Sequence, residues 1–129
     1  MCHFSFEGRL IYRGKWCLVE VPKDVINYYI KTIYSVWGIK LNSSYHGAHV
    51  TVVDGRREDA SRHKLWGTNH GKKVLVEYSE IRNKSPYYTG EYWWLKVRNT
   101  QDFSNIRVML GLPEKLFWDF HITIGYNNV

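Results

Sequence analysis

Two short segments of the chain alternate strictly between polar and apolar side chains. They read His49-Val50-Thr51-Val52 and His121-Ile122-Thr123-Ile124. A period of two is typical of a β-strand with one open face and one buried face, because successive side chains point to opposite sides. Each segment therefore predicts a strand that presents a histidine and a threonine together on its open face, with aliphatic residues behind them.

The same order of elements is expected before each of these strands. Apolar runs bounded by turn residues predict strands, and apolar residues at helical spacing followed by glycine predict helices. We expect strands over 4–12, 15–21, 48–53, 73–79, 91–98 and 120–126, and helices over 23–36 and 101–110. Loops are expected over 56–72, with room for one helical turn, and over 80–90, which contains Pro86.

The resulting order is β-β-α-β followed by β-β-α-β, a weak internal duplication that is visible in the elements rather than in residue identity. The 129 residues contain no linker rich in Pro, Gly or Ser, so we expect one domain over 1–129. This pattern predicts an α+β fold with a pseudo-twofold arrangement, with antiparallel sheets around a central cleft and helices outside. The two final strands would then lie side by side, and both motifs would face the cleft.

The formal net charge of +6 favours anionic partners such as nucleotides. The positive charge is spread along the chain, and its only adjacent basic pairs are Arg56-Arg57 and Lys72-Lys73. This distribution favours a local phosphate site over a groove for duplex DNA. The chain contains no run of 18 apolar residues, so no membrane span is expected. The N-terminus shows no apolar signal core, so we expect the protein in the cytoplasm.

Paired imidazoles and hydroxyls are suited to phosphodiester cleavage. A neutral histidine can take a proton from the attacking oxygen, and a protonated one can give a proton to the leaving oxygen. Thr51 and Thr123 can donate hydrogen bonds to the non-bridging phosphate oxygens. We therefore expect His49 and His121 to alternate as base and acid without a metal or cofactor, with their individual roles left open. Where the substrate has a 2′-OH, that hydroxyl can be the nucleophile.

A single His-x-Ser or His-x-Thr tripeptide is a weak signal. His3-Phe4-Ser5 also fits the pattern, but it lies at the terminus and follows no helix. The other two tripeptides are set apart by their context, since each lies in an apolar strand that follows a helix. Cys2 and Cys17 have no metal-ligand spacing, and reduced thiols are expected.

These paired motifs resemble those of the 2H phosphoesterase superfamily, which is named for its two His-x-[Ser/Thr] strands, and the resemblance covers nearly the whole chain. One subgroup of phage proteins is more similar still. Its GxHxxVxxGE segment resembles HGAHVTVVDG, although Asp54 precedes Gly55 and Arg56 stands where that pattern usually has Glu. Further similar segments are Leu65-Trp66-Gly67, Gly71-Lys72-Lys73, Val76-Glu77-Tyr78-Ser79, Tyr92-Trp93-Trp94-Leu95, Ile106-Arg107, Leu110-Gly111-Leu112 and the final FHITIG.

The subgroup includes anti-CBASS proteins, which degrade the cyclic di- and trinucleotides that signal infection in bacteria. The resemblance implies metal-independent hydrolysis of 3′–5′ bonds in such cyclic oligonucleotides, in the host cytoplasm if a phage encodes the chain. An RNA 2′,3′-cyclic phosphodiesterase or an oligoadenylate-processing enzyme would use the same four residues. A non-catalytic cyclic-nucleotide sponge is a third reading, although it has no need of paired histidines. The sequence leaves the preferred base, the ring size and the oligomeric state open.

Four further residues are candidates for substrate binding, each with a structural alternative. Tyr12 could stack on a base or pack on the sheet, and Trp66 could belong to a mobile lid or anchor its loop. Lys72 could contact a phosphate or remain solvated, and Tyr78 lies on a strand beside the expected cleft. Trp93 and Trp94 point to opposite faces, so at most one of them faces the cleft.

Overall fold

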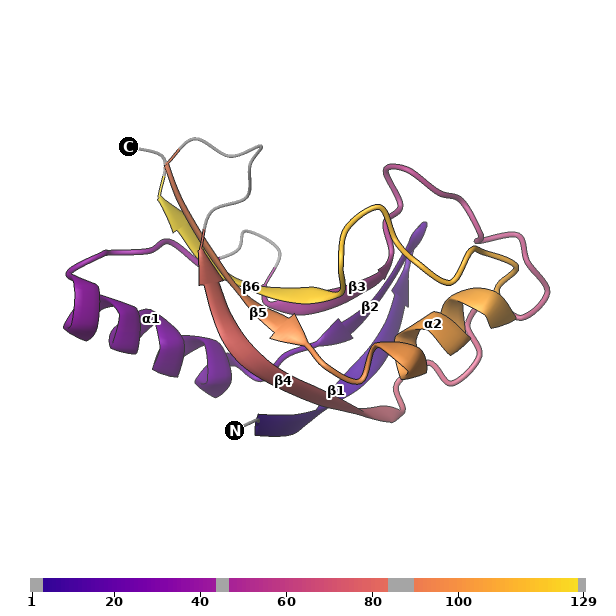
Figure 1. Ribbon diagram of the computed structural model, residues 1–129. Coiled ribbons are helices and arrows are strands. Elements are labelled where there is room, and N and C mark those ends of the chain that lie inside the picture. Colours follow the sequence, from indigo (N-terminus) through magenta and orange to yellow (C-terminus); the bar gives the residue numbers. More distant parts are fainter. Residues whose placement is uncertain (1–3, 44–46, 84–89, 128–129) are drawn as a thin grey trace.

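The computed structural model describes residues 4–43, 47–83 and 90–127, and the side chain of residue 80 is not described. Cys2, His3, His46 and Pro86 lie outside the described residues. The elements follow the expected order, with a helix third and seventh (Figure 1). They are β1 Phe4–Arg13, β2 Trp16–Glu20, α1 Lys23–Trp37, β3 His49–Val53, β4 Lys73–Asn83, β5 Glu91–Val97, α2 Thr100–Met109 and β6 His121–Asn127.

The fold is α+β, and all of its strand pairs are antiparallel. The strands close into a barrel in the order β1-β2-β3-β6-β5-β4, because β1 pairs with β2 along one part of its length and with β4 along the other. β3 and β6 are neighbours at the centre, as expected from the sequence. Both helices lie on the same side of these two strands, at opposite ends of the molecule (Figure 1).

β4 is longer than the strand expected over 73–79. The expectation of a loop over 80–90 is therefore wrong for residues 80–83, which belong to β4. β4 pairs with β1 from Lys73 to Tyr78 and then with β5 as far as Asn83. Tyr78 takes part in both pairings, and a register shift between Tyr78 and Ile81 within the pairing with β5 interrupts the apolar alternation. The alternation in the sequence therefore ends at this register shift, although the strand continues to Asn83.

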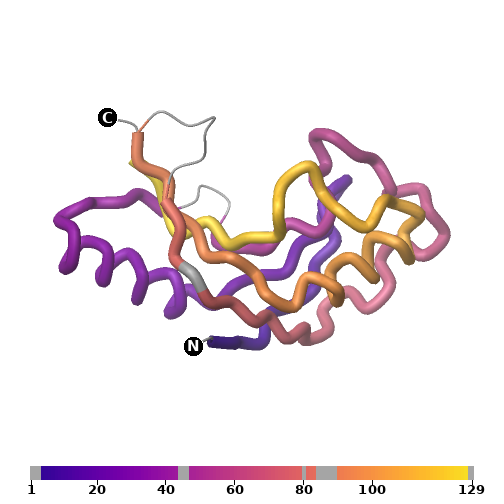
Figure 2. The backbone as a smooth tube through the Cα atoms, in the orientation of Figure 1, coloured from indigo at the N-terminus to yellow at the C-terminus, as the bar shows by residue number. Residues whose placement is uncertain are grey.

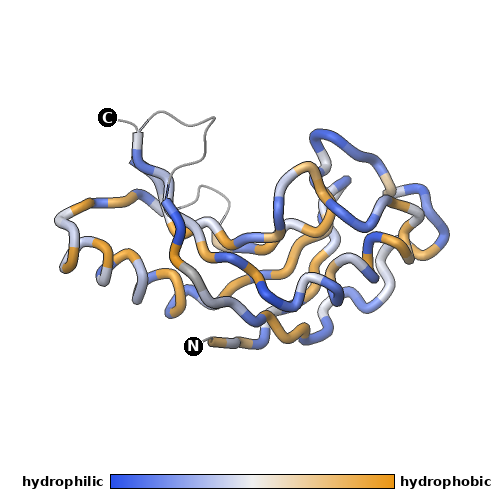
Figure 3. The backbone as a smooth tube through the Cα atoms, in the orientation of Figure 1, coloured by the Kyte–Doolittle hydropathy of each residue, from blue (hydrophilic) through white to orange (hydrophobic). Residues whose placement is uncertain are grey.

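The segment between β3 and β4 is a succession of hydrogen-bonded turns rather than a helix. Several of its N–H groups donate to carbonyl oxygens three residues earlier, for example from His63 to Ala60 and from Trp66 to His63. Figure 2 shows this segment and the connection from α2 to β6 side by side at the end of the molecule where α2 lies. The part that follows β3 is mainly hydrophilic (Figure 3).

The core contains the aliphatic residues of the two motif strands. Val50, Val52, Ile122 and Ile124 all have 0% exposure, in agreement with the alternation of the sequence. Cys17 is a buried free thiol, and burial raises its pKa to about 12. Within the described residues, no helix has the length and apolar character that a membrane crossing requires.

Arg107 on α2 joins both segments that flank the motif strands. Its side chain is 1% exposed, and its Nη1 donates to the Val52 carbonyl oxygen of β3 at 2.8 Å. Glu58 accepts from both terminal nitrogens, at 2.8 and 2.7 Å. The carbonyl oxygens of Pro113 and Lys115 accept at 2.9 and 3.3 Å. The buried guanidinium thus ties the segment after β3 and the segment before β6 to the same helix.

We expect Arg107→Met to lower the free energy of unfolding by about 3–5 kcal/mol, because it leaves Glu58 and three carbonyl groups without their charged donor. Urea denaturation measures this change. Arg62→Met is the matched control on an exposed arginine, and its effect should stay within about 0.5 kcal/mol. Equal stability of the two variants would contradict the role given to Arg107.

Candidate active site

The pairing of β3 with β6 brings the two His-x-Thr motifs together. Val50 lies opposite Ile122 in an antiparallel register, with both side chains in the core. When this register is continued by one residue each way, Thr51 lies opposite His121 and His49 lies opposite Thr123. Directly opposite residues share one face, with Cβ atoms about 4.5–5.5 Å apart. The four polar side chains, all half-buried, therefore form one group on the face away from the core.

Both motif histidines make the same local hydrogen bond. The Nδ1 atom of His49 lies 3.0 Å from the Gly47 carbonyl oxygen, and the Nδ1 atom of His121 lies 2.7 Å from the Asp119 carbonyl oxygen. A carbonyl oxygen can only accept, so Nδ1 carries the proton in each ring. Nε2 is then the nitrogen that can accept a proton from a substrate and later return it. The two imidazoles are thus held in the tautomer that general acid–base chemistry requires.

β5 contributes two aromatic residues that the sequence reasoning did not place among the site residues. The Tyr92 hydroxyl lies 2.7 Å from Thr123 Oγ1 and 3.3 Å from His121 Nε2. Trp94, opposite Thr123 in the register, meets the His121 ring edge-on at 5.7 Å between centroids. The alternation in 91–98 was the available signal, because it places Tyr92, Trp94 and Lys96 on one face.

The expectation that Trp93 and Trp94 point to opposite faces is confirmed. Trp93 is 5% exposed and packs against Trp37 of α1, whereas Trp94 contacts His121. Among the described residues, the indole N–H of Trp94 is the one buried side-chain polar group without a hydrogen-bond partner. Such a group costs about 1–3 kcal/mol when unpaired, and it is rare enough in native proteins to mark a site of interest.

The electrostatic surroundings of the two histidines differ. Lys96 of β5 lies opposite His121, whereas Glu20 of β2 lies opposite His49. Burial lowers the pKa of His121, and the hydrogen bond and nearby charge of Asp119 offset part of this effect. His121 is therefore held as the neutral imidazole near pH 7. A neutral imidazole can act as a base but cannot donate the proton that a general acid supplies.

Two of the four further candidates, Tyr12 and Trp66, pack against each other away from the motif face. Tyr12 lies opposite Cys17, whose side chain is fully buried on the core side. Its hydroxyl donates to the Thr68 carbonyl oxygen at 2.9 Å, and its ring meets that of Trp66 at 4.8 Å. Burial raises the pKa of the Tyr12 hydroxyl. The pair anchors the 66–70 turns to β1, which is the structural alternative stated for both residues.

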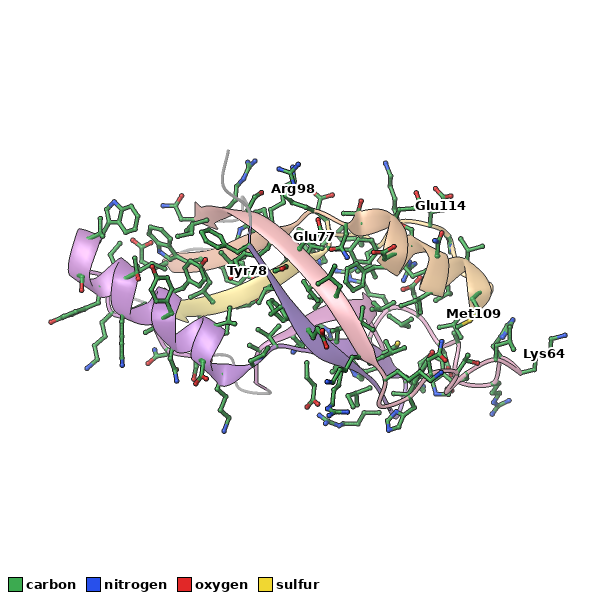
Figure 4. The ribbon with its side chains drawn as sticks, turned by 90° about the horizontal axis from the view of Figure 1, so that it is seen from below. Lys64, Glu77, Tyr78, Arg98, Met109 and Glu114 are labelled. Atoms are coloured by element: carbon green, nitrogen blue, oxygen red, sulfur yellow. The ribbon has the colours of Figure 1, made fainter. Side chains whose placement is uncertain are left out.

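Tyr78 and Lys72 are also not brought to the motif face. Tyr78 is 6% exposed and packs against Phe6 and Tyr29, and Figure 4 shows it beside α1 in the view from below. Lys72 is exposed. It borders a cavity of about 270 Å³ between the 68–74 segment and α2, whose lining also includes Asn69, Lys73, Asn105 and Met109. None of the motif residues lines this cavity.

Comparisons with protein-family models, with curated proteins and with solved structures gave no match for this chain. Among the described residues, no three His, Cys, Asp or Glu side chains gather in an arrangement that could hold a metal ion.

We expect His121 to titrate below its ordinary pKa of 6.5 in the folded protein. The unfolded state would then bind more protons than the folded state just below pH 6.5, so His121 lowers stability as the pH falls through this range. Histidine proton resonances followed from pH 8 to pH 4 test the expectation, with His121→Gln to assign the signal. A midpoint at or above 6.5 would contradict it.

Proposed function

We propose that the chain is a metal-independent phosphodiesterase of the 2H type, built from two pseudo-twofold β-β-α-β units. The observation that carries the proposal is the matched state of the two histidines. In each imidazole the Nδ1–H group donates a hydrogen bond to the carbonyl oxygen two residues before it, which leaves Nε2 for the substrate. Both rings lie on one face of the antiparallel strands β3 and β6, and each ring lies beside the threonine of the other strand. This arrangement supplies two proton-transfer groups and two hydroxyl donors.

The reaction follows from these four side chains. One imidazole takes a proton on Nε2 from an attacking 2′-hydroxyl as its oxygen bonds to phosphorus. The other, protonated, gives its proton to the O5′ atom as the P–O5′ bond breaks. Thr51 and Thr123 donate hydrogen bonds to the non-bridging oxygens, where negative charge increases. The product carries a 2′,3′-cyclic phosphate, which water can open by the reverse roles of the two histidines.

The substrate class we propose is a cyclic di- or trinucleotide, cleaved at its 3′–5′ bonds. A small ligand with two or three phosphates suits the modest net charge of +6, which is not gathered in one run. The resemblance to the phage anti-CBASS subgroup supports the same substrate and a role in the evasion of bacterial immunity. Trp94 and Tyr92 add aromatic surface beside the phosphate-binding hydroxyls, and aromatic rings stack on bases of any identity.

The test is a panel of cyclic dinucleotides, cyclic trinucleotides and RNA ending in a 2′,3′-cyclic phosphate, each incubated with the protein in EDTA and analysed by chromatography. We expect the cyclic oligonucleotides to be opened. If the cyclic oligonucleotides stay intact while the RNA ends are opened, the protein is an RNA 2′,3′-cyclic phosphodiesterase instead. Binding without turnover would support a sponge, and activity that EDTA abolishes would reject the metal-free mechanism.

His49→Ala and His121→Ala should each lower turnover of the cleaved substrate at least a hundredfold, since each removes one proton-transfer group. His63→Ala is the matched control, because His63 lies in the turn segment and its Nδ1 accepts from the Leu65 N–H. Circular dichroism and urea denaturation establish that the variants fold. A near-normal rate in either motif variant would reject the two-histidine mechanism.

A further inference from the structure

One hydroxyl joins both side chains of the second motif. Tyr92 reaches from β5 to Thr123 at 2.7 Å and to His121 at 3.3 Å, although Tyr126 is its partner in the register. The ladder shifts by one residue between Trp93 and Trp94, and this shift separates Tyr92 from the regular pairing at Trp94. The half-buried Tyr92 side chain thus extends back over the two motif residues.

The hydrogen atoms of this group can be assigned in part. The His121 Nδ1 proton is committed to Asp119, so the neutral ring has only a lone pair at Nε2. Tyr92 has a single hydrogen, and the shorter contact is to Thr123. If Tyr92 donates to Thr123 Oγ1, the hydrogen of Thr123 remains for a phosphate oxygen. The tyrosine oxygen then has no hydrogen for the neutral Nε2 of His121, and it can accept from that nitrogen only when the ring is protonated.

We propose that Tyr92 is a positioning residue of the phosphodiesterase site, which orients the Thr123 hydroxyl and supports His121 as the general base. This inference rests on the proposed function and assigns the two roles that the motifs alone leave open. The 2′-hydroxyl gives its proton to His121 as its oxygen bonds to phosphorus. The protonated ring then donates from Nε2 to the tyrosine oxygen, Tyr92 donates to Thr123, and Thr123 donates to the phosphate. His49 supplies the proton to the leaving oxygen.

The surroundings of His121 explain why a neutral acceptor is needed there. Tyr92 and Lys96 face the ring from β5, Asp119 precedes it in the chain, and His49 shares its face from β3. Burial opposes a positive charge on the ring, so it is neutral at rest. The Asp119 carbonyl and the Tyr92 oxygen accept from the imidazolium once it forms. Tyr92 therefore stabilises the ring in its charged state.

Tyr92→Phe tests the proposal, because it removes only the hydroxyl oxygen. We expect kcat to fall at least about tenfold, as when a donor to the reacting phosphate is misaligned, while KM changes little. The acidic limb of the kcat/KM profile, which reports the free base, should move to lower pH. Tyr29→Phe is the matched control, since its hydroxyl donates to that of Tyr78 in the core, away from the motif face. It should alter neither rate nor profile.

Titration of His121 by NMR in the free protein gives a second measurement that does not require activity. Tyr92→Phe should lower the midpoint, because the imidazolium loses an acceptor. An unchanged midpoint, or unchanged kcat and pH profile, would overturn the role of Tyr92. If wild-type protein cleaves no substrate but the midpoint still moves, the proposed phosphodiesterase function fails while the contact between Tyr92 and His121 is established. If the wild-type protein cleaves substrate and Tyr92→Phe cleaves it equally well, the role of Tyr92 is rejected and the phosphodiesterase function stands.

Discussion

The site depends on one backbone pairing, that of Val50 with Ile122. Both side chains are fully buried, so the register of β3 against β6 is fixed by the core behind it. A slip by one residue would turn the aliphatic residues outward and the histidines into the core, which makes the alternative registers unfavourable. The same burial that stabilises the fold therefore sets which histidine faces which threonine. The packing of the apolar face thus fixes the relative positions of the four polar side chains on the opposite face.

Arg107 acts on the segments that the pairing does not reach. It binds Glu58 after β3 and the carbonyl groups of Pro113 and Lys115 before β6. The Asp119 carbonyl, which fixes the tautomer of His121, belongs to the second of these segments. Arg57 strengthens the same junction, with its guanidinium 4.3 Å from the centroid of the Phe117 ring. The two connections are thus held together by cations from α2 and from the turn after β3.

The regular part of the fold and the motif group could be predicted because they follow from local alternation. Strict period-two patterns at His49 and His121 give both the strands and their faces, and the repeated element order predicts that β3 and β6 are neighbours. The same alternation in 91–98 places Tyr92 on the open face, but its reach to Thr123 and His121 could not be predicted, since it depends on a register shift between β5 and β6. The alternatives left open for Tyr12 and Tyr78 have a related cause. An aromatic residue on a strand is equally compatible with either face until its cross-strand partner is known.

The first half of the chain, from β1 to β3, pairs with the second half, from β4 to β6, at two places. There β1 pairs with β4, and β3 pairs with β6. Each helix also contacts the motif strand of the other half, α2 against β3 and α1 against β6. Neither half could close its sheet alone, because separation would leave open strand edges and an uncovered apolar face. Two fragments produced by cutting the 56–72 segment would each carry one of the two motif histidines, and each would offer the other its missing strand edges.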